Sequence, residues 1–278
     1  MSNLELIFFW ITVMIYALAS GGYIYSLVSK DTRLLSRLTP FLVAGFCTHC
    51  ATAAVRYHAV GHLPWAGDYE SALMGGWFII AATLVMGWRN KALQGLAVGT
   101  VPLVVLMMGF GYMRNPVLAP LSVNLKSYWL YIHVYFAWLA FCSYVLAMAA
   151  GTLYLLGSRK AGSAGENGLF NRLPSLERLD ELIFRFVVFG FINDSLMMAA
   201  GSIWARGLWG SYWSWDPIES WSLISWLIYG SVIHMRVIFG WTGARMAWMA
   251  IAALSSAVIA FFGVGLMAGS LHVFNVQP

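Results

Sequence analysis

The chain has 278 residues, of which 60% are hydrophobic and only 10% are charged, and its mean hydropathy is +0.74. Soluble domains carry about 25% charged residues, because a surface in contact with water needs them. This composition excludes a soluble enzyme, a nucleic-acid-binding domain and a disordered chain. We expect an all-α, polytopic membrane protein in which residues 1–278 form a single integral-membrane domain.

Eight apolar stretches are long enough to span a membrane, since about 20 residues of helix cross a hydrocarbon core of ~30 Å. The stretch at 40–57 is the weakest, because it is short and carries Cys47, His49 and Cys50, and the stretch at 127–156 is too long for the core alone. The first span lacks a basic segment before it, so we expect it to be retained rather than cleaved as a signal peptide. The predicted transmembrane helices are residues 4–28, 40–57, 71–88, 92–113, 127–156, 182–205, 217–239 and 246–269.

Basic residues predict the orientation of these helices. Eight spans place both termini on one side, and twelve of the 16 Lys and Arg residues then fall on the other side. Cytoplasmic loops carry the excess of Lys and Arg, so we expect both termini on the periplasmic, or outer, side. The polar stretch at about 157–181 is then cytoplasmic, and we expect it to divide a five-helix front from a three-helix back.

Six of the 14 tryptophans lie in one short segment, residues 204–226, around the predicted outer loop between the sixth and seventh helices. An aromatic belt at the membrane interface is one interpretation, but a belt distributes its aromatics over many helix ends. Indole rings also offer flat faces and an N–H donor, which favours a site for a large, flat, apolar ligand. Asp216, Pro217 and Glu219 form a helix start signal, which gives the acids a structural interpretation.

The run WGSYWSWDP at residues 209–217, with Trp221 and His234 after it, resembles the WWD signature of haem-handling proteins. It is most similar to the CcsA, or ResC, type of System II cytochrome c biogenesis protein. Supporting pieces extend the resemblance over residues 41–272, and they are Gly61–Trp65, Tyr69–Ser71, Ser127–His133 and Leu271-His272. This chain departs from the family pattern at Ile218, where Lys is usual, and at Asn193-Asp194, in a normally apolar stretch.

The resemblance implies the haem-binding, haem-delivering subunit of a membrane cytochrome c synthetase, or haem lyase, in the bacterial cytoplasmic (inner) membrane. Its cofactor would be b-type haem, bound non-covalently and in transit from the cytoplasmic leaflet to the outer face. There the vinyl groups would be presented to the Cys-x-x-Cys-His motif of an apocytochrome c, whose thiols add to them as thioethers. The family also implies a membrane partner of the CcsB, or ResB, type. Catalytic residues are unknown, since the sequence offers no candidate acid or base.

Histidines are the candidate iron ligands, because neutral imidazole is the commonest protein ligand of haem. His133, near the outer end of the fifth helix, and His272, just past the eighth, are predicted at the level of the tryptophan segment, and the resemblance implies that both ligate an external haem. His234 lies roughly 27 Å along a helix from Asp216, so it is either structural or a ligand of a second, inner haem. The other expected cofactor-binding residues are Trp209, Trp213, Trp215, Asp216 and Trp221.

Other polar residues have two interpretations each. Cys47 and Cys50 are a dithiol pair or small residues packed between helices, and His49 between them could contact haem in transit. Asp194, predicted near the middle of the bilayer, is typical of a functional position. The cations on the predicted outer side could pair with haem propionates or anchor lipid headgroups, and they are Arg56, Arg114, Lys126 and Arg206.

Two alternative functions fit the same helical plan. A membrane b-type cytochrome that carries electrons would need paired histidines at two depths, and His234 has no evident mate at its own depth. A non-catalytic regulator of haem synthesis would need neither the tryptophan segment nor both outer histidines. The presence of that segment argues against the regulator.

Overall fold

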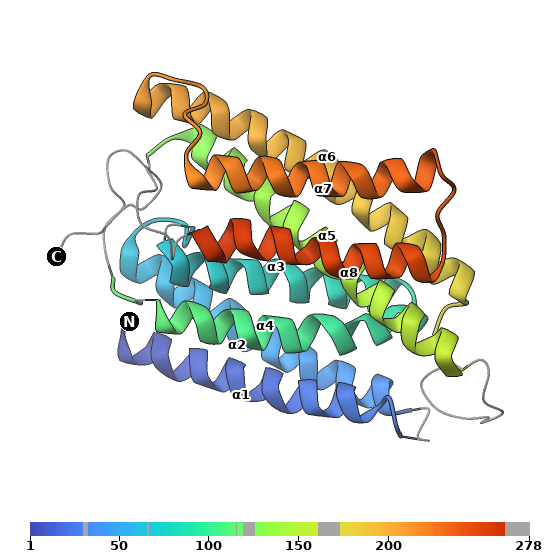
Figure 1. The fold of residues 1–278 in the computed structure, drawn as a ribbon. Helices are drawn as coiled ribbons and strands as arrows, with labels where there is room; N and C mark the ends of the chain where they lie inside the picture. Colours follow the sequence, from blue (N-terminus) through green and yellow to red (C-terminus); the bar gives the residue numbers. More distant parts are fainter. Residues whose placement is uncertain (30–32, 66, 115, 119–125, 161–172, 265–278) are drawn as a thin grey trace.

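The computed structural model describes residues 1–29, 33–65, 67–114, 116–118, 126–160 and 173–264. In these residues the chain is all-helical, and its long helices lie side by side as one bundle (Figure 1). The helices are α1 (Asn3–Tyr25), α2 (Leu34–Val60), α3 (Gly67–Arg89), η1 (Lys91–Leu96), α4 (Ala97–Met113), α5 (Tyr128–Lys160), α6 (Leu176–Trp209), α7 (Pro217–Val237), α8 (Ala244–Val258) and η4 (Ile259–Gly263). The predicted all-α fold is confirmed.

Seven helical stretches are long and apolar enough to cross a membrane, and they are α1, α2, α3, η1 with α4, α5, α6, and α8 with η4. The helix outside this group is α7, because serines and charged residues interrupt its apolar side chains. It has 21 residues and packs against α6 and α8 within the bundle. The chain is therefore a multi-pass helical protein in which seven of the eight predicted spans meet the length and composition of a membrane helix.

Several helices extend beyond the apolar stretches that predict them. α2 begins at Leu34 rather than at residue 40, and α5 continues to Lys160 rather than ending at residue 156. The fourth predicted span opens with the 3-10 helix η1. The described part of the eighth includes the π-helical turn η4, and residues 265–269 of that span lie outside the described residues. Hydropathy marks only the part of a helix that suits the hydrocarbon core, so polar residues that continue the helix are missed.

The connection between α6 and α7 is fixed at both of its ends. Gly210 terminates α6 in the left-handed conformation, with φ of 78°, which glycine adopts without steric cost. Asp216 caps α7 by accepting a hydrogen bond from Ile218 N at 2.9 Å, and Glu219 accepts one from Asp216 N at 3.3 Å. This reciprocal capping box satisfies backbone donors that a helix start leaves unpaired, and it confirms the predicted start of α7.

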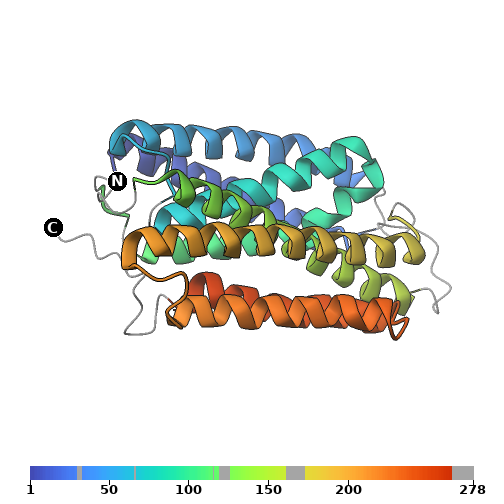
Figure 2. The same ribbon diagram turned by 90° about the horizontal axis from the view of Figure 1, so that it is seen from above.

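α5 lies in the middle of the bundle, with α1 and α2 on one side and α7 and α8 on the other (Figure 2). It packs most extensively along α6 and then against α8. Gly151 lets α5 approach α8 closely, since a Cβ there would lie 3.0 Å from the carbonyl oxygen of Ala247. The expected division into a five-helix front and a three-helix back is therefore wrong, because α5 packs chiefly with the helices assigned to the back.

Successive helices run in opposite directions, so the starts of α1, α3, α5 and α7 gather at one end of the bundle with the ends of α2, α4 and α6 (Figure 1). We call this the tryptophan end, because residues 209–217 lie there. The end of α7 lies at the opposite end of the bundle, so His234 is separated from the tryptophan end as the helix length predicts.

Candidate functional site

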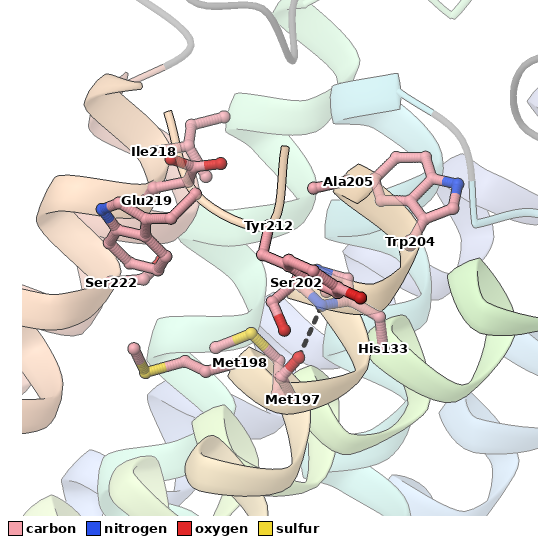
Figure 3. Close-up of a pocket in the computed structure, with 12 residues that line it drawn as sticks. His133, Met197, Met198, Ser202, Trp204, Ala205, Tyr212, Ile218, Glu219 and Ser222 are labelled. Atoms are coloured by element: carbon pink, nitrogen blue, oxygen red, sulfur yellow. Dashed lines mark hydrogen bonds between the residues drawn. The ribbon is translucent and has the colours of Figure 1, made fainter. Parts of the chain in front are cut away.

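Two cavities lie at the tryptophan end, and His133 and Trp204 line both. The large cavity, of about 230 Å³, is bounded by the start of α3, by α5 and α6, by the start of α7 and by η4. The small cavity, of about 50 Å³, lies between α5, α6 and α7. Figure 3 shows the small cavity with Ile218 and Glu219 of α7 across from His133. The two cavities also share Met197, Ile218 and Ser222.

His133 is held in place by α6. Its Nδ1 lies 2.9 Å from the carbonyl oxygen of Met197 (Figure 3), and because a carbonyl only accepts, Nδ1 carries the hydrogen. In the neutral imidazole Nε2 then carries the lone pair, which is the form that ligates a metal. Gly201 leaves room for the ring, since a Cβ at this position would lie 2.6 Å from Nδ1. The sequence therefore fixes both the tautomer and the place of this imidazole.

Tryptophans of α6 and of the α6–α7 connection contact this histidine directly, reach it through another tryptophan or line the small cavity with it. The Trp204 ring is buried, and its centroid lies 6.2 Å from that of His133 at an interplanar angle of 30°. Trp209 meets Trp204 at 5.9 Å and 60°, and Trp213, which lines the small cavity, meets Trp215 at 5.8 Å and 86°. Because these pairs meet edge to face, a flat ligand would be contacted by individual indoles rather than by one continuous flat surface.

Four residues expected in the tryptophan segment do not line either cavity as the described residues bound it, and they are Trp209, Trp215, Asp216 and Trp221. Trp215 is 71% exposed and has a φ of 59°, which is uncommon for a residue other than glycine. Asp216 is buried as the N-cap of α7, and Trp221 is half-buried in the first turns of that helix. Asp216 therefore shapes the connection, as its structural interpretation predicts.

Glu219 ties the tryptophan segment to α7 and also lines the small cavity. Its carboxylate accepts hydrogen bonds from the backbone N of Ser214, at 2.7 Å, and from the Ser214 hydroxyl, at 3.2 Å. The side chain is 9% exposed. Glu219 thus fixes the shape of the loop that carries Trp213 and Trp215.

The front of the chain contributes walls that our sequence reasoning missed. Four such residues line the large cavity. Trp65 lies just before α3, Asp68 and Ser71 lie in the first turns of α3, and Trp138 lies on α5. Trp138 follows His133 by five residues, about 7.5 Å along a helix. The sequence signal for Trp65 is the stretch Gly61–Trp65, which is part of the family resemblance although the resemblance assigned it no role.

Arg56 is not available to an acidic ligand, contrary to one of the two interpretations given above. It is 3% exposed, and its Nε donates a hydrogen bond to Glu70 at 2.8 Å. Its two Nη atoms donate to the carbonyl oxygens of Pro116 and Val117, at 3.0 and 2.8 Å. Glu5 also lies 3.6 Å from this guanidinium. Arg56 therefore joins α1, α2, α3 and the segment after α4.

Two other cations contact residues of the cavity walls. Arg114 pairs with Asp68 of the large cavity at 2.9 Å, and this pair is partly exposed. The guanidinium of Arg206 lies 5.7 Å above the ring of Tyr212, which lines the small cavity. Lys126 is exposed before α5.

Within the described residues, the structure does not place either of the other two candidate iron ligands at this site. His272 lies outside the part of the chain that the structure describes. His234 is exposed near the end of α7, where its ring meets Phe239 edge to face at 5.6 Å. The structure therefore groups His133 with Trp204, Trp209 and Trp213, and it separates His234 from them.

Two polar groups inside the bundle are satisfied by neighbouring helices. The ring nitrogens of His49 lie 3.2 Å from the hydroxyl of Tyr16 and 3.0 Å from the carbonyl of Leu73. Asp194 is buried and accepts a hydrogen bond from the Tyr144 hydroxyl at 3.0 Å. Both arrangements connect helices, which favours structural roles for these residues.

Cys47 and Cys50 are both free thiols. Cys47 is exposed on α2, whereas the Sγ of Cys50 accepts a hydrogen bond from Trp77 Nε1 at 3.2 Å. The described residues therefore show no disulfide between them, and Cys50 packs between α2 and α3.

These observations define a class of protein: a multi-pass helical membrane protein with a histidine- and tryptophan-lined site at one end of its bundle. Residues 65–272 match the family described as cytochrome C assembly protein, and the chain belongs to that family. It is 27% identical to the cytochrome c biogenesis protein CcsA of Guillardia theta, over 98% of this chain and 92% of that protein. It is 31% identical to the CcsA of Synechococcus sp. (strain CC9902), over 81% of this chain and 82% of that protein.

A solved structure shares the fold. The cytochrome c heme lyase CcmF matches with a TM-score of 0.72 and 16% identity, and the match covers 95% of this chain. It covers 48% of CcmF, so the chain spans about half the length of that protein. The family and its CcsA-type relatives establish that this chain is a CcsA-type protein that acts in cytochrome c biogenesis.

Proposed function

We propose that this chain is the haem-presenting subunit of a membrane cytochrome c synthetase. The observation that carries the proposal is His133, whose Nδ1 is fixed by the Met197 carbonyl in a wall that both cavities share. This hydrogen bond leaves the lone pair on Nε2, the form in which histidine ligates haem iron. The role in cytochrome c biogenesis is that of the family, and the haem site is the finer assignment that we add.

The chemistry of the cavity walls fits haem. A porphyrin is a wide, flat, apolar ring with two carboxylates, and the large cavity has apolar walls at Leu130, Val134 and Phe261. The walls also offer donors, because the indole N–H groups of Trp65 and Trp138 are buried without a hydrogen-bond partner among the described residues. We propose a b-type haem that is bound non-covalently. When bound, it would supply the vinyl groups to which the thiols of an apocytochrome c add as thioethers.

The chain's own residues would hold this group and exclude water. We propose that His133 and His272 would ligate the iron. Trp204 and Trp213 would contact the ring, while Trp209 supports Trp204. Of the remaining proposed cofactor-binding residues, Asp216 would fix the connection, and Trp215 and Trp221 would cover the approach from the membrane surface. Fixed geometry of this kind makes an otherwise bimolecular reaction effectively unimolecular.

We further propose that α1 to α8 all cross the bacterial cytoplasmic membrane, with the tryptophan end on the periplasmic side. Cytoplasmic helix ends carry most Lys and Arg, and the helix ends opposite the tryptophan end have this excess. Those residues are Arg33, Arg37, Arg89, Lys91, Arg159, Lys160, Arg178, Arg185, Arg236 and Arg245. Buried Tyr229 and Val232 fix α7 inside the bundle, which supports including it among the spans.

We propose His234 as a ligand of a second, inner haem. It is exposed at the end of the bundle that would face the cytoplasm, so a partner membrane subunit of the CcsB type could supply the second ligand there. Ionisable residues within membrane-spanning helices are rare and often functional, which favours a ligand role for His234. The acceptor at the outer site would be an apocytochrome c with a Cys-x-x-Cys-His motif.

Replacement of His133 tests the proposed function. The full chain, purified with its partner subunit, should carry haem with the absorption spectrum of bis-histidine ligation. His133→Ala and His272→Ala should each lose the external haem and cytochrome c maturation, and added imidazole should restore part of both. His58→Ala, an exposed histidine at the same end of the bundle, is the matched control and should change neither. Full haem content and full maturation in both variants would contradict the assignment.

A further inference from the structure

Two residues that line the large cavity, Trp65 and Trp138, carry buried indole N–H donors and belong to neither the histidines nor the tryptophan segment discussed above. Trp138 on α5 is 3% exposed, and Trp65 before α3 is half-buried. The Nε1 atom of each indole is buried without a hydrogen-bond partner among the described residues, and both residues line the large cavity. A buried donor without a partner is disfavoured, so such donors in a cavity wall indicate where a ligand brings an acceptor.

Packing prevents the Trp138 ring from turning to another partner. Its six-membered ring fills the space beside Gly75, where a Cβ would lie 2.3 Å from the ring atom Cζ3. The rings of Phe141 and Phe261 pack against it, with centroid distances of 5.9 and 5.3 Å. The N–H group is therefore held in one direction before any ligand binds. A donor that is already ordered loses little entropy on binding and selects where the acceptor must lie.

Trp65 is placed differently, because it precedes α3 at the rim of the bundle. Its ring lies 5.8 Å from that of Tyr131, on α5, at an interplanar angle of 60°. This contact links the connection between α2 and α3 to the helix that carries His133 and Trp138. The two donors thus belong to separate elements, and both residues line the same cavity.

The other walls restrict the acceptor that could enter. No Lys or Arg lines the large cavity among the described residues, and its one carboxylate, Asp68, is paired with Arg114. Most of the remaining wall is apolar, at Leu130, Val134 and Ala137. A matching ligand has an apolar body and few acceptor atoms at its edge. The edge of haem carries methyl, vinyl and propionate groups, and only the propionates accept hydrogen bonds.

We propose that Trp65 and Trp138 are positioning residues that bind the propionates of haem through their indole N–H groups. The inference rests on the proposed function, since it concerns the same site, but it adds the orientation of the ring. The propionate edge faces the two indoles, and the vinyl groups lie on the opposite edge. A ring turned the other way would leave both donors unpaired and would bury the propionates against apolar side chains, which is strongly disfavoured.

Two porphyrins, one with propionates and one without, distinguish hydrogen bonding to propionates from simple packing of the indole rings. The probes are haem and iron etioporphyrin, which has the same ring and iron but carries only methyl and ethyl groups. The dissociation constants are measured by absorbance on the full chain in detergent, with His234→Ala as background so that only the outer site is titrated. Trp138→Phe and Trp65→Phe keep an aromatic ring and remove the N–H. Trp88→Phe, at an 84% exposed position on α3, is the matched control.

We expect Trp138→Phe to weaken haem binding about tenfold, the size expected for one hydrogen bond to a charged group. Binding of iron etioporphyrin should stay within about twofold of the background protein, since that probe makes no such bond. Trp65→Phe should show the same selectivity, and Trp88→Phe should bind both probes as the background protein does. Equal losses for the two porphyrins, or no loss for either, would overturn the inference. Failure of the background protein to bind either porphyrin would instead contradict the proposed function.

Discussion

Arg56 and His133 both lie at the tryptophan end of the bundle, yet their surroundings differ in kind. The Arg56 guanidinium is enclosed by Glu70 and two backbone carbonyls, all within 3.0 Å. His133 has its Nδ1 fixed by a carbonyl, but it forms part of the wall of two cavities. The polar groups of Arg56 are used in contacts within the chain, whereas His133 lines the cavities that we propose hold a ligand. Arg56 and His133 lie at the same end of the bundle, but their contacts favour a structural role for Arg56 and a ligand-binding role for His133.

The largest effect should come from breaking the Arg56 cluster. Arg56→Ala leaves Glu5 and Glu70 buried beside each other without their cation, and loss of one partner of a buried pair costs about 3–5 kcal/mol. We expect a large drop in the midpoint of thermal unfolding in detergent. Arg114→Ala, which breaks a partly exposed pair with Asp68, is the matched control and should cost less than about 1 kcal/mol. Similar losses in the two variants would show that burial does not distinguish them.

A smaller effect should come from moving His133 without removing it. In Gly201→Ala the new Cβ would meet Nδ1 at 2.6 Å, so the ring must shift and its hydrogen bond to Met197 must lengthen. We expect haem affinity to fall about tenfold, as for the loss of one strong hydrogen bond. The measurement is the dissociation constant by absorbance. Gly207→Ala on the same helix meets nothing within 4 Å, and unchanged affinity there is the required control.

The smallest effect concerns the connection that carries the tryptophans. Asp216→Ala removes the N-cap of α7 and should lower the free energy of unfolding by about 1 kcal/mol. Asp216→Asn keeps a good capping side chain and should stay within a few tenths of a kcal/mol, roughly the scatter between capping residues. Both are measured by unfolding in detergent. If Asp216→Asn abolished haem binding while keeping stability, Asp216 would have a direct role at the site rather than a capping role.

Much of the fold could be predicted from local features of the sequence. Apolar stretches gave the helices, and the spacing of Asp216, Pro217 and Glu219 gave the start of α7, because capping depends on neighbours within one turn. Helix ends outside the apolar stretches, such as Leu34, were missed because hydropathy says nothing about polar helical residues. The packing of α5 with α6 was also missed, since chain order does not say which faces of two helices meet.

The candidate site was predictable only where its residues cluster in the sequence. The tryptophan segment and His133 stand out by composition and by resemblance. The Met197 carbonyl that fixes His133 is a backbone atom, and every residue has one, so no sequence pattern could single it out. Trp65 and Trp138 reach the cavity through tertiary packing. The pairing of Arg56 with carbonyls sixty residues further along is likewise a product of the folded bundle.

The position of the iron is the most direct test of the difference between these two regions. An experimental structure of the haem-loaded chain with its partner subunit would locate it. We expect the iron at bonding distance from Nε2 of His133, in the large cavity, with Arg56 still paired to Glu70. An iron bound away from His133, or a haem at the tryptophan end that contacts neither His133 nor Trp204, would contradict the assignment.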